Sequence, residues 1–166
     1  LRVLAGLTRP TAGTVEYPDG RPVGYAFQQP NVYPDLTVRE NLDAFAHLGG
    51  ARDGWRERLV GTLRLGPVSE RLAADLSDGF AKKLDLALAF LREPAVVFLD
   101  EPLADLDDVT RRNLVGLVGE YRAPDRLVVV STHNLAWFDE VLTRLTVMYD
   151  GTVLLDESAA ALDAPP

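Results

Sequence analysis

The sequence contains no cysteine, one methionine and two lysines, and it lacks any long apolar run. Without cysteine the chain forms no disulfide, and a reducing compartment is compatible with its composition. The longest apolar stretch, Leu84–Leu91, has eight residues and includes Asp85. A membrane-spanning helix needs about 20 apolar residues, so the sequence predicts no such helix.

Positive charge is also scarce. Lys and Arg number 17 against 25 Asp and Glu, and the net charge is −8. Nucleic-acid binding depends on basic patches that neutralise phosphates, so we expect no nucleic-acid partner. The 166 residues, 47% of them hydrophobic, suffice for one domain with its own core.

Strand and helix signals alternate along the chain. Ala95–Leu99 and Arg126–Ser131 are almost wholly apolar, as strands of buried parallel sheets are. Shorter strands are predicted at 14–17 and 23–27, separated by a Pro-Asp-Gly turn, and a hairpin at 145–149 and 152–155 around Asp150-Gly151. Helices are predicted at about 38–48, 55–65, 68–74, 77–92, from 107 or 108 to 122, and 134–141. This order favours an α/β domain with a mostly parallel sheet.

Two helix starts carry local signals. In TVRE, Thr37 is followed three residues later by Glu40, which is the pattern of a capping box. Ser77, in LSDGF, is a candidate N-cap. A serine hydroxyl and backbone N–H groups at a helix N-terminus can also bind a phosphate, so Ser77 and Gly79 have both a capping and an anion-binding interpretation.

Acidic and imidazole side chains follow the two apolar strands. AVVFLDEP ends in Asp100 and Glu101, and STHN places His133 after the next strand. In parallel sheets, chemistry gathers at the carboxyl ends of the strands, so these groups are expected to share a site. An aspartate there can sit near a magnesium ion, and a glutamate can polarise water for attack on a phosphate. The alternatives are solvated or helix-capping acids and a structural histidine.

Together these segments resemble, in order and spacing, the ATP-binding subunit of an ABC transporter. The resemblance runs from RVLAGLTRPTAGTV (residues 2–15) to the final hairpin. It implies a P-loop NTPase-like α/β fold with a mostly parallel sheet and a small helical subdomain, without the family's N-terminal strands. Residues 1–29 and 76–156 would form the partial ATPase core, 30–75 the helical subdomain, and 157–166 a loose tail.

The resemblance also implies residue roles, with ATP and Mg²⁺ as cofactors. Glu101 would polarise the attacking water and His133 would contact the γ-phosphate. Asp100 would hold magnesium. Gln28, with Gln29 as the less favoured register, would link magnesium and water to the helical subdomain.

Further roles concern partners. Ser77 and Gly79 match the family's signature motif, which faces the ATP of a second, head-to-tail subunit, and Asp107 matches the loop that connects the two sites. The resemblance implies transmembrane permease subunits as partners and a place at the cytoplasmic face of the cell membrane. The phrase YPDLTVRENL (residues 33–42) is similar to exporter-type subunits.

Two departures from the family pattern raise alternatives. The phosphate-binding loop GxxxxGK[ST] is absent, since the two lysines are Lys82 and Lys83. We therefore expect that the sequence begins just past that loop and that this piece alone binds ATP poorly. Asp78 stands where the family has glycine, and Lys82, one helical turn later, could pair with it. A non-hydrolysing regulatory or dimerising subunit stays an alternative function, as does a small unrelated α/β enzyme.

Overall fold

The computed structural model describes residues 1–17, 23–47 and 53–162. The chain divides into two compact units, Leu1–His133 and Asn134–Pro166, and each is described by itself. The predicted turn at Pro18–Gly20 lies outside the described residues.

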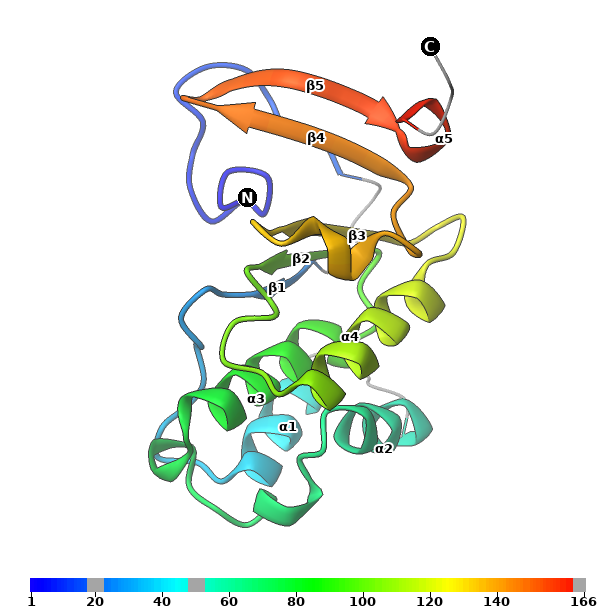
Figure 1. Cartoon of the computed structure of the whole chain (residues 1–166). Coiled ribbons are helices and arrows are strands. Elements are labelled where there is room, and N and C mark those ends of the chain that lie inside the picture. Colours follow the sequence, from blue (N-terminus) through cyan, green and yellow to red (C-terminus); the bar gives the residue numbers. More distant parts are fainter. Residues whose placement is uncertain (18–22, 48–52, 163–166) are drawn as a thin grey trace. The chain divides into compact units, whose positions relative to one another are not determined.

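A three-stranded parallel sheet organises the first unit (Figure 1). Its strands are β1 (Val23–Ala26), β2 (Val96–Asp100) and β3 (Leu127–Ser131), in the order β1-β2-β3. The central strand β2 is buried along nearly its whole length, which explains its apolar composition. The predicted parallel sheet is therefore confirmed.

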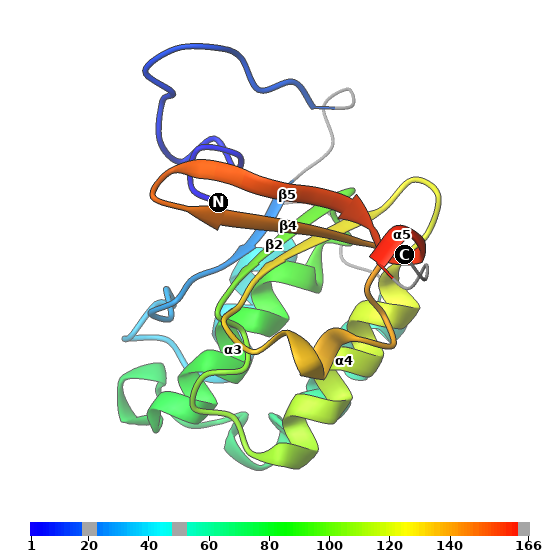
Figure 2. The ribbon, with the colours of Figure 1, turned by 45° about the horizontal axis from the view of Figure 1, so that its top comes forward.

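One helix, α3 (Asp78–Leu91), lies directly against the sheet, and three others surround it on that side (Figures 1 and 2). These are α1 (Val38–His47), α2 (Asp53–Thr62) and α4 (Asp108–Tyr121). Every residue of α3 from Lys82 onward is buried, because the sheet covers one side of the helix and α1 and α2 cover another. A Cβ on Gly24 in β1 would lie 2.0 Å from the backbone oxygen of Ala89, so this close approach requires glycine.

The opposite face of the sheet carries the N-terminal segment. Leu1 and Ala5 pack against a cluster formed by Ala95, Val96 and Phe98. The segment closes on a Schellman motif, in which the Leu7 N–H donates to the Arg2 carbonyl and Gly6 has φ of +72°. This left-handed residue is typical of a helix C-terminus.

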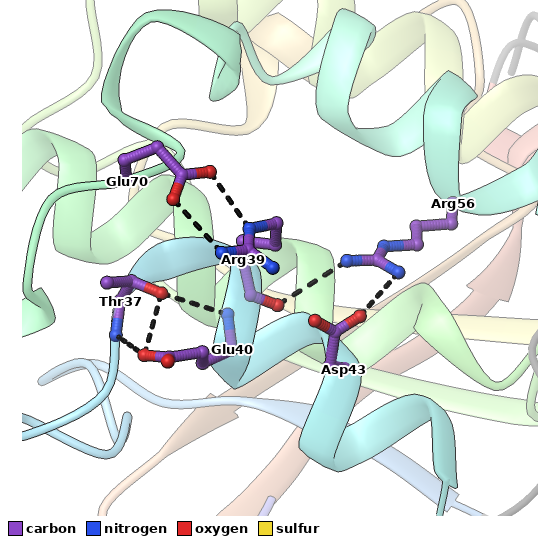
Figure 3. A network of polar contacts seen from close by, with 6 residues as sticks. All are labelled: Thr37, Arg39, Glu40, Asp43, Arg56 and Glu70. Carbon is purple, nitrogen blue, oxygen red and sulfur yellow. Dashed lines mark hydrogen bonds and ion pairs between the residues drawn. The ribbon is translucent and has the colours of Figure 1, made fainter.

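The capping box at the start of α1 is confirmed. The Thr37 N–H donates to Glu40 Oε2 at 2.8 Å, and the Glu40 N–H donates to Thr37 Oγ1 at 3.1 Å (Figure 3). Each side chain thus satisfies a backbone donor of the other residue. Further along α1, Arg39 forms a two-pronged ion pair with Glu70.

The predicted helix over 68–74 is wrong. Two short 3₁₀ helices, η1 (Gly66–Val68) and η2 (Ala73–Asp75), flank an irregular stretch. The carbonyls of Ser69 and Arg71 accept the N–H groups of Arg39 and Val38 in the first turn of α1. These N–H groups have no partner within their own helix, so the stretch completes α1 instead of forming a helix.

The predicted strand at Thr14–Tyr17 is also wrong, because these residues are irregular. Strand propensity produces a strand when a neighbouring strand satisfies its backbone groups. Within the described ranges, the ladders of the sheet join β1, β2 and β3 alone.

The second unit contains an antiparallel hairpin of β4 (Arg144–Tyr149) and β5 (Thr152–Ser158). Asp150 and Gly151 have φ of +46° and +74°, which is the two-residue turn that their sequence predicts. The predicted helix at 134–141 is a short 3₁₀ helix, η3 (Leu135–Phe138). β5 continues to Ser158 and α5 spans Ala159–Leu162, while the remaining residues of the expected loose tail, 163–166, lie outside the description.

Among the residues that the structure describes, none of the helices has the length and apolarity to span a bilayer.

The capping box can be tested by replacing Thr37 with alanine. Losing an N-cap hydroxyl costs about 1 kcal/mol, so the free energy of unfolding in urea should fall by about that amount. Thr11→Ala, at an exposed threonine outside helices and strands, is the matched control and should change stability by less than about 0.5 kcal/mol. Equal stabilities of the two variants would contradict the capping role.

Candidate functional site

The carboxyl ends of β2 and β3 bring the predicted acidic residues to one edge of the sheet. The register pairs Asp100 with Ser131, and the Ser131 hydroxyl donates to Asp100 Oδ1 at 2.5 Å. The hydroxyl of Tyr25, on β1, donates to Asp100 Oδ2 at 3.1 Å. Side chains from two neighbouring strands thereby fix both carboxylate oxygens of Asp100.

Burial, and after it the neighbouring Asp100 carboxylate, together raise the pKa of Tyr25 to about 12. Both effects disfavour the phenolate. Tyr25 therefore remains a hydrogen-bond donor to Asp100 at physiological pH.

Glu101 and His133 meet at the same edge. His133 Nδ1 lies 3.0 Å from Glu101 Oε2, and the side chains are 86% and 26% exposed respectively. The Glu101 N–H donates to the Ser131 carbonyl, while its φ of +44° lies in the left-handed region. Such a conformation is costly for a residue with a side chain and clusters at functional sites. It turns Glu101 away from the strand direction, toward His133.

A lysine reaches this edge from α3. Lys82 is 1% exposed, and its Nζ donates to the carbonyls of Phe27 at 2.5 Å, Gln28 at 3.3 Å and Asp100 at 3.1 Å. All three N–H donors of the ammonium are therefore used. Burial lowers the pKa of Lys82, while the nearby carboxylates of Asp85 and Asp100 oppose this shift.

Asp85, one turn further along α3, holds the same loop. Its Oδ2 accepts the Phe27 N–H at 2.7 Å and its Oδ1 accepts the Asn31 N–H at 3.1 Å. Burial raises the pKa of Asp85 to about 6, against the lowering effect of these two hydrogen bonds. Asp85 is 2% exposed, and the two backbone donors offset part of the cost of desolvating its carboxylate.

The Asp107 side chain forms hydrogen bonds with residues of α3 and α4. It caps α4 by accepting the Thr110 N–H at 2.9 Å, and its Oδ2 lies 2.8 Å from Lys83 Nζ. The hydrogen bond from Lys83, followed by those from Thr110, holds the pKa of Asp107 well below its usual range. Asp107 is thus the N-cap of α4, which settles the helix start that the sequence left open between 107 and 108. A side chain of α3 fixes this loop as well.

The first turn of α3 contains the signature-like residues. Ser77 caps the helix through the Phe80 N–H at 3.5 Å and is exposed. A Cβ on Gly79 would lie 2.7 Å from the Asp105 carbonyl oxygen, so glycine lets the helix start pack against the loop before α4. The expected pairing of Lys82 with Asp78 is wrong, because Lys82 points to the sheet edge while Asp78 is exposed.

The structure therefore brings Asp100, Glu101 and His133 together. Lys82 also links the backbones of Gln28 and Asp100, because its ammonium donates to both carbonyls. Gln28 itself is exposed. Ser77 and Gly79 lie at a different place, beside the loop that leads to Asp107.

Residues that the sequence did not single out complete the site: Tyr25, Ser131, Asp85 and Lys83. One signal points to two of them, Lys83 and Asp85. Charged residues interrupt the apolar pattern of α3 at Lys82, Lys83 and Asp85, and an interruption of that kind indicates a buried partner. Nothing in the sequence reveals that Tyr25 reaches Asp100, since this contact depends on the register of β1 and β2.

The carboxylate oxygens at this edge of the sheet suit a Mg²⁺ ion whose other ligands are phosphate and water. Magnesium uses one or two carboxylates and keeps several waters, and Asp100 supplies such a carboxylate. Across the described ranges, no group of three or more histidine, aspartate or glutamate side chains could hold a metal by itself.

A cavity of the first unit lies elsewhere. Its volume is about 820 Å³, and its lining is largely apolar, with Val96, Phe98 and Val129 from the sheet. None of the predicted site residues lines it. An open edge of a parallel sheet, with polar groups from several strands, is the better candidate for a phosphate-containing ligand.

Comparisons with known proteins agree with this geometry. The structure resembles a solved structure described as the ATP binding subunit of an ABC transporter, with a TM-score of 0.84 and 27% identity over 95% of this chain and 71% of that one. The fold is thus the α/β fold of P-loop NTPases, as predicted.

Sequence comparison identifies the family. The profile described as ABC transporter matches residues 1–104. The probable multidrug ABC transporter ATP-binding protein YbhF of Escherichia coli (strain K12) is 35% identical over 98% of this chain and 30% of its own length. The fluoroquinolones export ATP-binding protein MT2762 of Mycobacterium tuberculosis (strain CDC 1551 / Oshkosh) is 29% identical over 99% of this chain and 56% of its own length. The chain belongs to the ABC transporter family, and it spans 30% and 56% of the length of these two relatives.

The raised pKa of Asp85 predicts a pH dependence. A carboxyl group with a folded-state pKa of about 6, above its ordinary 3.8, stabilises the fold below pH 3.8, and this contribution is lost as the pH rises through about 6. The stability of the wild type relative to Asp85→Asn should therefore fall by about 2 to 3 kcal/mol between about pH 4 and pH 7 in urea unfolding. The exposed-residue variant Glu57→Gln should show no such trend. A pH-independent difference between wild type and Asp85→Asn would contradict the raised pKa.

Proposed function

We propose that this chain is part of an ATP-binding and ATP-hydrolysing subunit of an ABC transporter. The observation that carries the proposal is the cluster at the carboxyl edge, where Asp100 is held by Tyr25 and Ser131 while Glu101 lies 3.0 Å from His133. Phosphoryl transfer needs positioned charges and a polarised water, and this edge supplies groups for both.

In this proposal Glu101 polarises the attacking water, with its carboxylate aimed by the left-handed backbone and by His133. His133, which is largely exposed, is free to turn its ring toward a γ-phosphate. Asp100 and Gln28 would hold Mg²⁺, which neutralises charge on the phosphates when bound. Because both oxygens of Asp100 are fixed, its position does not depend on the nucleotide.

The partners follow from the same proposal. Ser77 is exposed in the first turn of α3, where a helix N-terminus can bind a phosphate. With Gly79 it would contact the ATP of a second, head-to-tail subunit, and Asp107 would lie at that interface. Residues 30–75 would form the helical subdomain that contacts transmembrane permease subunits at the cytoplasmic face of the cell membrane.

The similarity to YbhF and to the fluoroquinolones export protein supports an exporter-type transporter. The 166 residues contain no GxxxxGK[ST] sequence. Such a loop surrounds phosphates with backbone N–H groups and adds a lysine, so we expect low ATP affinity from these residues alone. Nucleotide assays therefore use the full-length protein.

A non-hydrolysing regulatory subunit is the second candidate. The exposed Asp78 in the first turn of α3 favours it, because a carboxylate there would repel a phosphate at the helix N-terminus. Tight ATP binding without turnover by the wild-type full-length protein would support this alternative.

Glu101→Gln tests the proposed hydrolysis directly. Glutamine keeps the size of the side chain but polarises water poorly, so ATP turnover by the full-length protein should fall by at least about 100-fold. ATP binding, measured by calorimetry with Mg²⁺, should change little. Glu57→Gln, on the exposed face of α2, should retain full turnover. Near-normal hydrolysis by Glu101→Gln would remove Glu101 from the proposed role.

A further inference from the structure

The loop after β1, residues 27–31, is held by α3 through two side chains of opposite charge. Lys82 donates hydrogen bonds to the carbonyls of Phe27 and Gln28. Asp85 accepts hydrogen bonds from the N–H groups of Phe27 and Asn31. The backbone of Phe27 is therefore bound on both sides. Gln28, the residue with a proposed role at the metal, follows Phe27 directly, and its own carbonyl is one of the attachment points.

The same ammonium also binds the end of β2. Lys82 Nζ lies 3.1 Å from the Asp100 carbonyl and 3.3 Å from the Gln28 carbonyl. One buried cation thus joins the backbones of the two residues that are proposed to hold Mg²⁺. Because one Nζ binds acceptors of both segments and hydrogen bonds weaken quickly with distance, a shift of the loop relative to Asp100 requires Lys82 to give up at least one acceptor.

If these two positions only filled the core, apolar side chains would stabilise the fold at least as well. Burying an ammonium and a carboxylate carries a desolvation cost that well-packed apolar groups avoid. The charges around Lys82 are acidic: besides Asp85 and Asp100, they include Asp105 and Glu101. Lys82 is thus a fixed positive charge inside an acidic edge, where it can hold carbonyls of two segments at once.

We propose that Lys82 and Asp85 are positioning residues that clamp the loop 27–31 and set the place of Gln28 relative to Asp100. Neither side chain is assigned a contact with nucleotide. The effect on catalysis rests on the proposed function, whereas the effect on the loop does not.

The catalytic part is tested by steady-state ATP hydrolysis of the full-length protein. Lys82→Met removes every donor, and kcat should fall by about 10-fold to 100-fold because the reacting groups are misplaced. Lys82→Gln keeps an N–H donor without the charge and should restore most of kcat. The KM for ATP should change less than kcat in both variants. Arg112→Met, at an exposed arginine of α4, is the control and should retain wild-type kcat.

A double-mutant cycle shows whether Lys82 acts through Gln28. If it does, Lys82→Met combined with Gln28→Ala should have a kcat close to that of the poorer single variant. Independent action would instead multiply the two losses. Multiplied losses, or an unchanged kcat in Lys82→Met, would overturn the proposed positioning role.

The clamp itself is tested without nucleotide by amide hydrogen exchange. Exchange in residues 27–31 should be at least about 10-fold faster in Lys82→Met and in Asp85→Asn than in the wild type, because each variant removes backbone partners of the loop. Exchange in residues 96–100 is the internal reference and should stay slow. Unchanged exchange of the loop in both variants would overturn the clamp. Faster exchange in a protein that hydrolyses no ATP would support the clamp and reject the proposed function.

Discussion

The burial of one ammonium group, that of Lys82, is the constraint on which the site depends. Its three hydrogen bonds run to the carbonyls of Phe27, Gln28 and Asp100, which belong to two different strand ends. A buried charge is tolerated when its donors are satisfied, so the loop after β1, the end of β2 and the second turn of α3 must come together in one arrangement. The parallel register of β2 and β3 then places the Ser131 hydroxyl in hydrogen-bond contact with Asp100. It also brings His133 within hydrogen-bond distance of Glu101.

The helix α3 is the element that these contacts share. Adjacent lysines point to different loops, with Lys82 at the loop after β1 and Lys83 at Asp107. The start of the helix packs against Asp105 through Gly79, and its remaining length is buried between the sheet, α1 and α2. A helix fixed in this way cannot move independently of either loop. In the proposed transporter subunit, α3 would therefore transmit a displacement at its exposed N-terminus to the backbone of Gln28 and to the loop before α4.

Much of the fold follows from the sequence, because its signals are local. Apolar strands ending in acids, a Thr–Glu capping box and an Asp-Gly turn each specify their own geometry, and all three form as predicted. The errors lie where tertiary contacts decide. Residues 68–74 have helix-forming composition, but their carbonyls satisfy the first turn of α1. Lys82 is spaced to pair with Asp78, but burial on α3 directs it to the sheet edge. The contact between Tyr25 and Asp100 needs the register of two strands that lie far apart in the sequence.

A crystal structure of the full-length protein with Mg²⁺ and a non-hydrolysable ATP analogue would test the central claim most directly. The proposed site predicts the terminal phosphate beside Glu101 and His133, with Mg²⁺ close to Asp100 and Gln28, and with Lys82 still bound to the carbonyls of Phe27 and Asp100. A nucleotide bound away from this edge, for instance in the apolar cavity beside Val96 and Phe98, would contradict the assignment of the site.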